Sequence, residues 1–99
     1  MSNRHMTTIT AAVWRWNGDK GSWHFVTVTG DAANDIGFDS IGTRGGFGSV
    51  KVEARIGEVR WRTSLFPSGD DWILPLKADV RRRAGIGEGD VVSIILRLA

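Results

Sequence analysis

Residues 71–98 read DWILPLKADVRRRAGIGEGDVVSIILRL, and this stretch decides the predicted fold. The apolar run at residues 72–74 is rich in strand formers, and Pro75 ends it because proline cannot donate a hydrogen bond to a neighbouring strand. Residues 77–84 are compatible with a helix whose acidic start and basic end suit the helix dipole. Gly85 is well placed to cap this helix. The stretch therefore begins as a strand followed by a short basic helix.

The remainder of this stretch predicts a tight turn and a long strand. Residues 86–90, IGEGD, have the glycine and acidic residues that are typical of turns. Residues 91–98 are strongly β-prone, and successive side chains of a strand point to opposite faces. One face carries Val92, Ile94, Leu96 and Leu98, and the other carries Val91, Ser93, Ile95 and Arg97.

This order of elements resembles the swapped-hairpin element of AbrB/MazE-type proteins. The matching residues are Pro75, the Arg81–Arg83 run, Gly85 with Ile86, and the turn at residues 88–90 with the strand after it. Pro75 lies slightly earlier relative to Gly85 than is usual in that family, and Ala84 stands where the family usually has leucine. The resemblance implies a small β-barrel made of two interlocked units, with DNA contacted by basic residues of both units.

The composition describes one small domain without disulfides. A chain of 99 residues, of which 41% are hydrophobic, is typical of one folding unit. We expect residues 1–7 to be a disordered polar N-terminus and residues 8–99 to be the domain. The chain has no cysteine, and its first residues contain no apolar signal segment. No apolar run is long enough to span a membrane, so we expect a cytoplasmic protein.

The rest of the chain predicts four further strands and a second short helix. The expected strands are residues 7–16, 23–29, 49–56 and 59–66. Asn17–Gly18 is a strong hairpin signal between the first two strands, and the last two alternate cleanly between apolar and polar side chains. Residues 31–36 are compatible with a helix that Gly37 caps. Five tryptophans are many for so short a chain, and we expect them to fill a small core.

The two halves of the chain share one order of elements: strand, turn, strand, short helix, turn and strand. We interpret residues 8–57 and 58–99 as a weak internal repeat. The matched pairs are Trp14 with Arg62, Phe25 with Ile73, Val28 with Leu76, Asp31 with Asp79, and Val50 with Val92. The sequence therefore predicts a mainly β protein, a small closed, double-split β-barrel of about six strands with two short helices and a pseudo-two-fold axis.

The chain from Ala12 onward also resembles a small bacterial family that is known as a domain of unknown function. The resemblance rests on GSWHF at residues 21–25, GGFGSV at 45–50, WRTSLFP at 61–67, Leu74–Pro75 with Lys77, and residues 87–90 with the final strand. It implies the small β-barrel fold and carries no established activity.

One set of residues predicts a pocket with aromatic walls and arginine anchors. Four of its members share one face of a predicted strand, namely Arg60, Arg62, Ser64 and Phe66. Trp14, Trp16 and His24 are expected to face them from other strands. Such a pocket suits a small anionic or planar ligand, or a peptide. The preferred hypothesis is therefore a non-enzymatic binding module, and the alternative for these residues is an exterior strand face covered by tryptophan.

A second set of residues predicts contact with DNA. Lys77 and the Arg81–Arg83 run lie on the basic helix, where arginines can contact phosphates or guanine edges. The corresponding residues 32–35 of the first half include no lysine or arginine, so a DNA-binding face would be lopsided. An AbrB-like DNA-binding regulator is therefore the alternative function, and nucleic acid is not the favoured partner. The simpler interpretation of the arginine run is a solvated helix end.

Catalytic and metal sites are not expected from the sequence. His24 lies in a predicted strand, His5 lies in the polar N-terminus, and the scattered carboxylates do not complete a catalytic triad. A metal site needs several histidines or clustered carboxylates, which the sequence does not offer. We expect no catalytic residue, no metal and no cofactor, and an enzyme acting through His24 is the third hypothesis. The expected state is a monomer or weak homodimer without a membrane partner.

Overall fold

The computed structural model describes residues 6–99, and this part of the chain is mainly β with two helices. The strands are β1 (Met6–Ala12), β2 (Trp14–Gly18), β3 (Gly21–Val28), β4 (Val50–Ile56), β5 (Val59–Ser68), β6 (Asp71–Pro75) and β7 (Val91–Leu98). The helices are α1 (Gly30–Asp39) and α2 (Ala78–Ala84), and a 3₁₀ turn occupies Gly46–Gly48. Neither helix of this part of the chain is long and apolar enough to cross a membrane.

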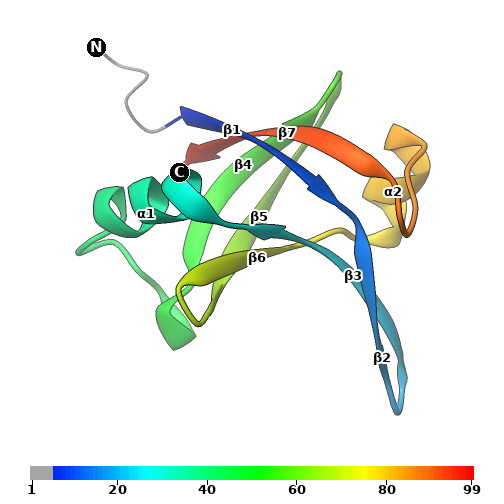
Figure 1. The fold of residues 1–99 in the computed structure, drawn as a ribbon, viewed down its shortest axis with the longest axis horizontal. Helices are drawn as coiled ribbons and strands as arrows, with labels where there is room; N and C mark the ends of the chain where they lie inside the picture. Colours follow the sequence, from blue (N-terminus) through cyan, green and yellow to red (C-terminus); the bar gives the residue numbers. More distant parts are fainter. Residues whose placement is uncertain (1–5) are drawn as a thin grey trace.

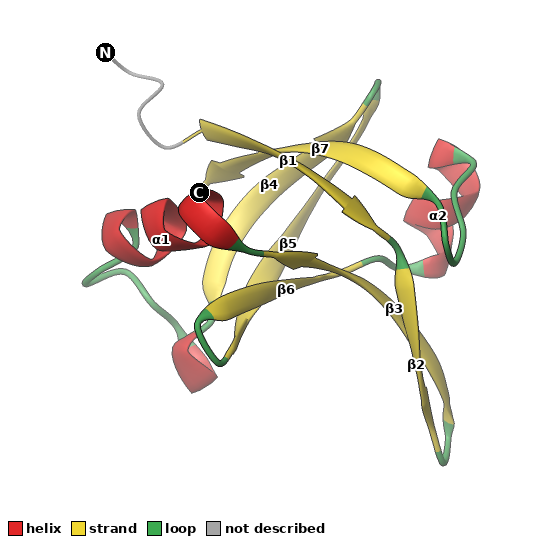
Figure 2. Cartoon of the chain, in the orientation of Figure 1, coloured by secondary structure: helices red, strands yellow, loops and turns green. Residues whose placement is uncertain are grey.

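The seven strands form one antiparallel sheet in the order β1-β7-β4-β5-β6-β3-β2. The sheet curls into a half-barrel around the core, with α1 and α2 at opposite sides of the molecule (Figure 1). The β2–β3 hairpin extends beyond the body of the barrel, on the side of α2 (Figure 2). Strands therefore make up the body of the protein, and the helices cover its two ends.

The prediction of a closed six-stranded barrel is wrong, because the first strand divides in two at Val13. The Val13 N–H donates to the Asp90 carbonyl at 2.8 Å, and its carbonyl accepts from the Gly89 N–H at 2.8 Å. These bonds to the turn before β7 hold the chain where it leaves the β7 side and joins the β3 side. Within residues 6–99, no ladder of hydrogen bonds joins β1 to β3, so the sheet remains open there.

Most predicted elements are present, and the main differences are at their ends. β1 begins at Met6, inside the expected polar tail, whereas the expected fraying of residues 1–5 lies outside the described residues. α1 continues past Gly37 to Asp39. β5 continues through Pro67, which has no N–H group to donate. The proline is tolerated because this end of β5 has a neighbouring strand on one side only, namely β6. The cap at Gly85 is confirmed, since its φ of 69° is left-handed.

The core lies inside the curl, and side chains of β3 to β7 supply most of it. Its largest fully buried aliphatic residues are Leu65, Leu74, Ile94, Leu96, Val13, Val26, Val28 and Val52. Trp72 is buried and Trp61 is half-buried, but the three tryptophans of the β2–β3 hairpin are exposed. The prediction that tryptophans fill the core is therefore wrong for these three, because aliphatic side chains already fill the small barrel.

The two halves of the chain contain the same elements in the same order. β1 with β2, β3, α1 and β4 form the first half, and β5, β6, α2 and β7 form the second. The order of strands in the sheet is also the same for both halves: if every strand is replaced by its counterpart in the other half, each strand still has the same neighbours. β3 lies beside its counterpart β6, and β4 lies beside its counterpart β7. The topology is therefore two-fold symmetric.

The register of the central strand pairs follows the same symmetry. Val26 of β3 lies opposite Leu74 of β6, and these residues are 48 apart in the sequence. Ala54 of β4 lies opposite Leu96 of β7, and these residues are 42 apart. Both offsets equal those of the pairs matched in the sequence. Each of the four residues therefore lies opposite its own counterpart in the other half.

The first strand departs from the offset that the sequence suggested. Trp14 lies opposite Phe25, whereas Phe66 lies opposite Ile73. Because Phe25 and Ile73 are counterparts, Trp14 corresponds to Phe66 and not to Arg62. The difference arises because the β2–β3 hairpin has five cross-strand pairs where the β5–β6 hairpin has three.

Candidate functional site

The structure separates His24 from the tryptophans that were expected to share a pocket with it. In the β2–β3 hairpin, His24 lies opposite Arg15, whereas Trp14 lies opposite Phe25. Successive residues of a strand point to opposite faces, so Trp14 and Trp16 are on the other face of the hairpin from His24. The predicted aromatic wall around His24 is therefore not formed by these two residues.

The tryptophans of the hairpin instead pack against their cross-strand neighbours. The rings of Trp14 and Phe25 are 4.9 Å apart between centroids, and those of Trp16 and Trp23 are 5.2 Å apart. The Trp14 indole N–H donates to the Thr27 hydroxyl at 2.8 Å. Tilted aromatic pairs at these distances stabilise a two-stranded ribbon. This aromatic row explains how a hairpin outside the barrel keeps its shape.

The four predicted pocket residues of β5 lie along its outward side and contribute to other surfaces. Arg60 lines a hollow of about 130 Å³ together with Arg55 and Arg97. Arg62 and Ser64 line a second hollow of about 360 Å³. Phe66 is 38% exposed at the end of the strand that pairs with β6. Arg60, Arg62 and Ser64 therefore line hollows different from the pocket that contains His24.

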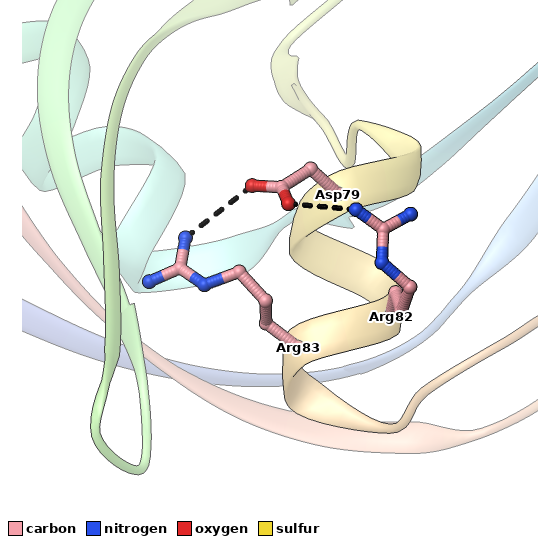
Figure 3. A network of polar contacts seen from close by, with 3 residues as sticks. All are labelled: Asp79, Arg82 and Arg83. Carbon is pink, nitrogen blue, oxygen red and sulfur yellow. Dashed lines mark hydrogen bonds and ion pairs between the residues drawn. The ribbon is translucent and has the colours of Figure 1, made fainter.

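The arginine run of α2 is divided between two roles. Arg82 and Arg83 both pair with the carboxylate of Asp79, at 2.9 and 3.4 Å, on the solvent side of the helix (Figure 3). Arg81 is half-buried and donates from Nε to the Leu76 carbonyl at 3.1 Å, at the junction of β6 and α2. The three predicted DNA contacts therefore do not form one equivalent set, because Arg81 alone turns toward the barrel.

Arg81 and His24 line the same pocket, which lies between β3, the end of β6 and α2. Its volume is about 270 Å³, and its walls are Ser22, Trp23, His24, Pro75, Leu76, Lys77, Ala78 and Arg81. The Leu76 N–H donates to the His24 carbonyl at 2.8 Å, which fixes the junction against β3. The pocket thus combines one residue of the predicted ligand site with two of the predicted DNA site.

The electrostatic environment of this pocket is positive. Burial lowers the pKa of His24 below its usual value, and the nearby charges of Arg81 and Arg15 lower it further, while Glu88 raises it. His24 is therefore a neutral imidazole at neutral pH. Within residues 6–99, no group lies within hydrogen-bond distance of its buried Nδ1. The pocket therefore contains two cations and a neutral ring with an unused polar atom.

A second pocket lies at the other end of the barrel, and the sequence did not indicate it. Its volume is about 530 Å³, and it lies between α1, the loop after it and the β5–β6 turn. The Arg44 guanidinium stands 5.3 Å from the Trp72 ring centroid and donates to the Gly37 carbonyl and the Ser40 hydroxyl. Asp70 and Asp71 also line this pocket. Arg44 is thus hydrogen-bonded to the end of α1. The lining of this pocket contains both this cation and two carboxylates.

The two pockets occupy corresponding positions in the two halves. The helices begin 48 residues apart, at Gly30 and Ala78, and the central β3 and β6 residues have the same offset. This offset makes Trp72 the counterpart of His24, and Ala33 the counterpart of Arg81. No local sequence pattern shows that β3 lies next to the start of α2. The 48-residue offset between the halves is the one sequence signal that could have placed His24 beside Arg81, because their counterparts Trp72 and Ala33 are also neighbours.

The comparisons with known proteins support a family and no activity. A family model described as a domain of unknown function, DUF1905, matches residues 10–96. A search of curated proteins finds no match. Among residues 6–99, no three histidines or carboxylates are grouped where they could hold a metal ion.

Proposed function

The chain belongs to the DUF1905 family, whose function is unknown, and we propose that it is a non-enzymatic binding module for a small molecule with a carboxylate or phosphate group. The proposed site is the pocket of His24, Lys77 and Arg81 between β3 and α2. Its chemistry differs from that of the sequence-based hypothesis, because Trp14 and Trp16 do not line it and its cations come from α2 and the residue before it.

The contrast between His24 and its counterpart Trp72 carries this proposal. The Trp72 indole N–H donates to the Ala33 carbonyl at 3.1 Å, so the buried polar atom at this position is satisfied within the protein. The buried Nδ1 of His24 has no such partner among residues 6–99. A buried polar atom without a partner costs about 1–3 kcal/mol. Because this Nδ1 is inaccessible in the unliganded protein, a ligand recovers this cost only if the imidazole turns to bring Nδ1 into the pocket.

The charges of the pocket support an anionic ligand. Arg81 is fixed by its Nε bond to the Leu76 carbonyl, which leaves its two terminal nitrogens for a ligand. Lys77 is exposed at the rim, and Arg15 adds positive potential from the opposite strand. A carboxylate or phosphate accepts charge-assisted hydrogen bonds from such groups, and an arginine can bind it through two parallel bonds.

The size and lining of the pocket restrict the ligand further. A volume of about 270 Å³ lies just below the usual range of about 300–1,000 Å³ for drug-sized ligands. Pro75, Leu76 and Ala78 supply the apolar lining. The pocket therefore suits one anionic group attached to a single small ring or short chain.

Titration of tryptophan fluorescence with phenyl phosphate tests this proposal, with benzylamine as the cationic counterpart. We expect the anion to bind and Arg81→Gln to weaken binding by about 10- to 150-fold, because a hydrogen bond to a charged group contributes about 1.5–3 kcal/mol. Arg82→Gln removes the same charge from the same helix, outside the pocket, and should change affinity by less than about twofold. Binding of benzylamine as strong as that of phenyl phosphate, or equal losses in the two variants, would contradict the proposal.

An AbrB-like regulator of duplex DNA is the second candidate, and the two-fold symmetry of the strands supports it. We infer that the halves arose by duplication of one swapped-hairpin unit, since both central registers and the helix starts keep constant offsets. The helix contacts of that family are weakened here, because Asp79 already pairs with Arg82 and Arg83. Loss of duplex binding on replacing these two arginines would favour the regulator over the small-molecule module.

A further inference from the structure

The outer face of β7, β4 and β5 is strongly basic, although the sequence spreads its charges evenly. Alternation along these strands places six charged side chains on this face: Lys51, Glu53, Arg55, Arg60, Arg62 and Arg97. All five cations are exposed, and the one carboxylate is half-buried. We call this surface the basic face. It is distinct from the pocket of His24 and from the arginines of α2.

The strand register arranges these charges in two rows. In one row, Arg55 of β4 lies directly opposite Arg60 of β5. In the next row, Glu53 lies between Arg62 of β5 and Arg97 of β7, and it pairs with Arg97 at 3.2 Å. Like charges directly opposite each other destabilise a sheet, so the Arg55–Arg60 pair opposes folding unless an anion covers it.

Arg55 is held in place, whereas the arginines of β5 are free to contact a partner. The Arg55 Nε donates to the Gly57 carbonyl at 2.6 Å, which directs this side chain toward the β4–β5 turn. Among residues 6–99, no carboxylate lies within ion-pair distance of Arg60 or Arg62. These two guanidinium groups therefore remain available on the surface.

Charge is separated between this face and the rest of the protein. Five cations and one carboxylate give the basic face a charge of +4, and the whole chain carries +2, so the remaining residues together carry −2. A basic patch on a body with a small negative net charge attracts polyanions mainly to that patch. The patch is therefore a local property that the net charge hides.

We propose that the basic face binds the backbone of single-stranded nucleic acid. Arg60 and Arg62 are two residues apart on one strand, which places their Cα atoms about 6.8 Å apart at a rise of about 3.4 Å per residue. This spacing resembles the step between phosphates of an extended single strand. Ser64 and the exposed Phe66 continue the same side of β5, and an aromatic ring beside a basic strip is what single-strand binding uses to stack bases.

Fluorescence anisotropy of a labelled 20-nucleotide single strand of mixed sequence tests this proposal. If three or four phosphates are neutralised, binding should weaken about 20- to 50-fold when salt rises from about 50 to about 200 mM. The double variant Arg60→Gln/Arg62→Gln should lower the slope of log affinity against log salt by about 1.4. Both residues are exposed on the outer side of the sheet, so the variant is expected to fold, and circular dichroism checks this.

The matched control is Arg82→Gln/Arg83→Gln, which removes two charges from α2. This control should bind the single strand within about twofold of the unchanged protein at the low salt. Equal losses in the two double variants would overturn the proposal, as would an absence of binding at the low salt. Tighter binding of the corresponding duplex would overturn the preference for a single strand. Equally tight binding of poly-glutamate would show instead that the face accepts acidic polypeptides.

Discussion

At the scale of single residues, the two halves differ most clearly at His24 and Trp72. Both occupy the same place in their hairpins, but Trp72 donates to a carbonyl of α1, whereas the buried Nδ1 of His24 has no partner among residues 6–99. The sequence identified His24 as the histidine to examine, and it could not assign its neighbours. Lys77 and Arg81 come after β6, so β4, β5 and β6 separate them from His24 along the chain.

The first prediction concerns the dependence of stability on pH. Burial and the charges of Arg81 and Arg15 lower the pKa of His24, so the unfolded chain binds this proton at a higher pH than the folded protein does. The contribution of His24 to stability is therefore complete above about pH 6.5 and is lost progressively as pH falls from that value toward the lowered pKa of the folded protein. We expect urea unfolding at pH 7.5 and 5.5 to show a larger loss for the unchanged protein than for His24→Gln.

This comparison has an internal control, since every other ionisable side chain is the same in the two proteins. The difference between the two pH dependences isolates His24. An identical loss of unfolding free energy in the two proteins would mean that the folded protein does not shift the pKa of this imidazole.

At the scale of elements, local patterns predicted the strands well and the helix ends less well. The strand at residues 91–98 has the predicted bounds, because its alternation is uninterrupted and its turn is rich in glycine. α1 exceeds its predicted end, because Arg44 donates to the Gly37 carbonyl from the following loop and satisfies the helix end. That contact is tertiary, so the residues of the helix could not reveal it.

The β2–β3 hairpin yields a second prediction, for Gly18→Ala. A methyl group at Gly18 would lie 2.5 Å from Cζ3 of Trp16 and 3.0 Å from Cζ3 of Trp23, so the Trp16 ring must move. Trp16 is 52% exposed and can turn into solvent, so we expect a cost below about 1 kcal/mol. Near- and far-ultraviolet circular dichroism should lose the coupled signal of the Trp16–Trp23 pair.

A matched control for this change is Gly87→Ala, since no atom lies within 4 Å of a methyl group at that glycine. The control should leave the tryptophan signal unchanged. A large loss of stability in Gly18→Ala would show that the aromatic row supports the barrel as well as the hairpin.

At the scale of the whole molecule, the Val26–Leu74 and Ala54–Leu96 pairs lie where the two halves of the chain meet in the sheet. All four side chains are buried, with Val26, Ala54 and Leu74 fully inaccessible. The sequence predicted the repeated order of elements, because strands and helices have local signatures. It did not predict the division of the first strand at Val13, since that depends on hydrogen bonds to a turn more than 70 residues later.

The third prediction tests the importance of these two buried pairs for stability. Leu74→Ala removes a fully buried side chain between β3 and β5, and we expect a loss of about 2–5 kcal/mol in unfolding free energy. Leu98→Ala makes the same chemical change at the half-buried end of β7, and its cost should be clearly smaller. Equal free-energy costs of the two substitutions in chemical denaturation would contradict a core centred on these two pairs.

The most direct test of the proposed function is an NMR titration of ¹⁵N-labelled protein with phenyl phosphate. We predict that backbone amide shifts concentrate at residues 22–24 and 76–81, which line the pocket of His24, Lys77 and Arg81. The amides around Arg44 and Trp72, in the corresponding pocket of the other half, should stay in place. Shifts centred on Arg44 and Trp72, or no shifts at saturating ligand, would contradict the assignment of the binding site.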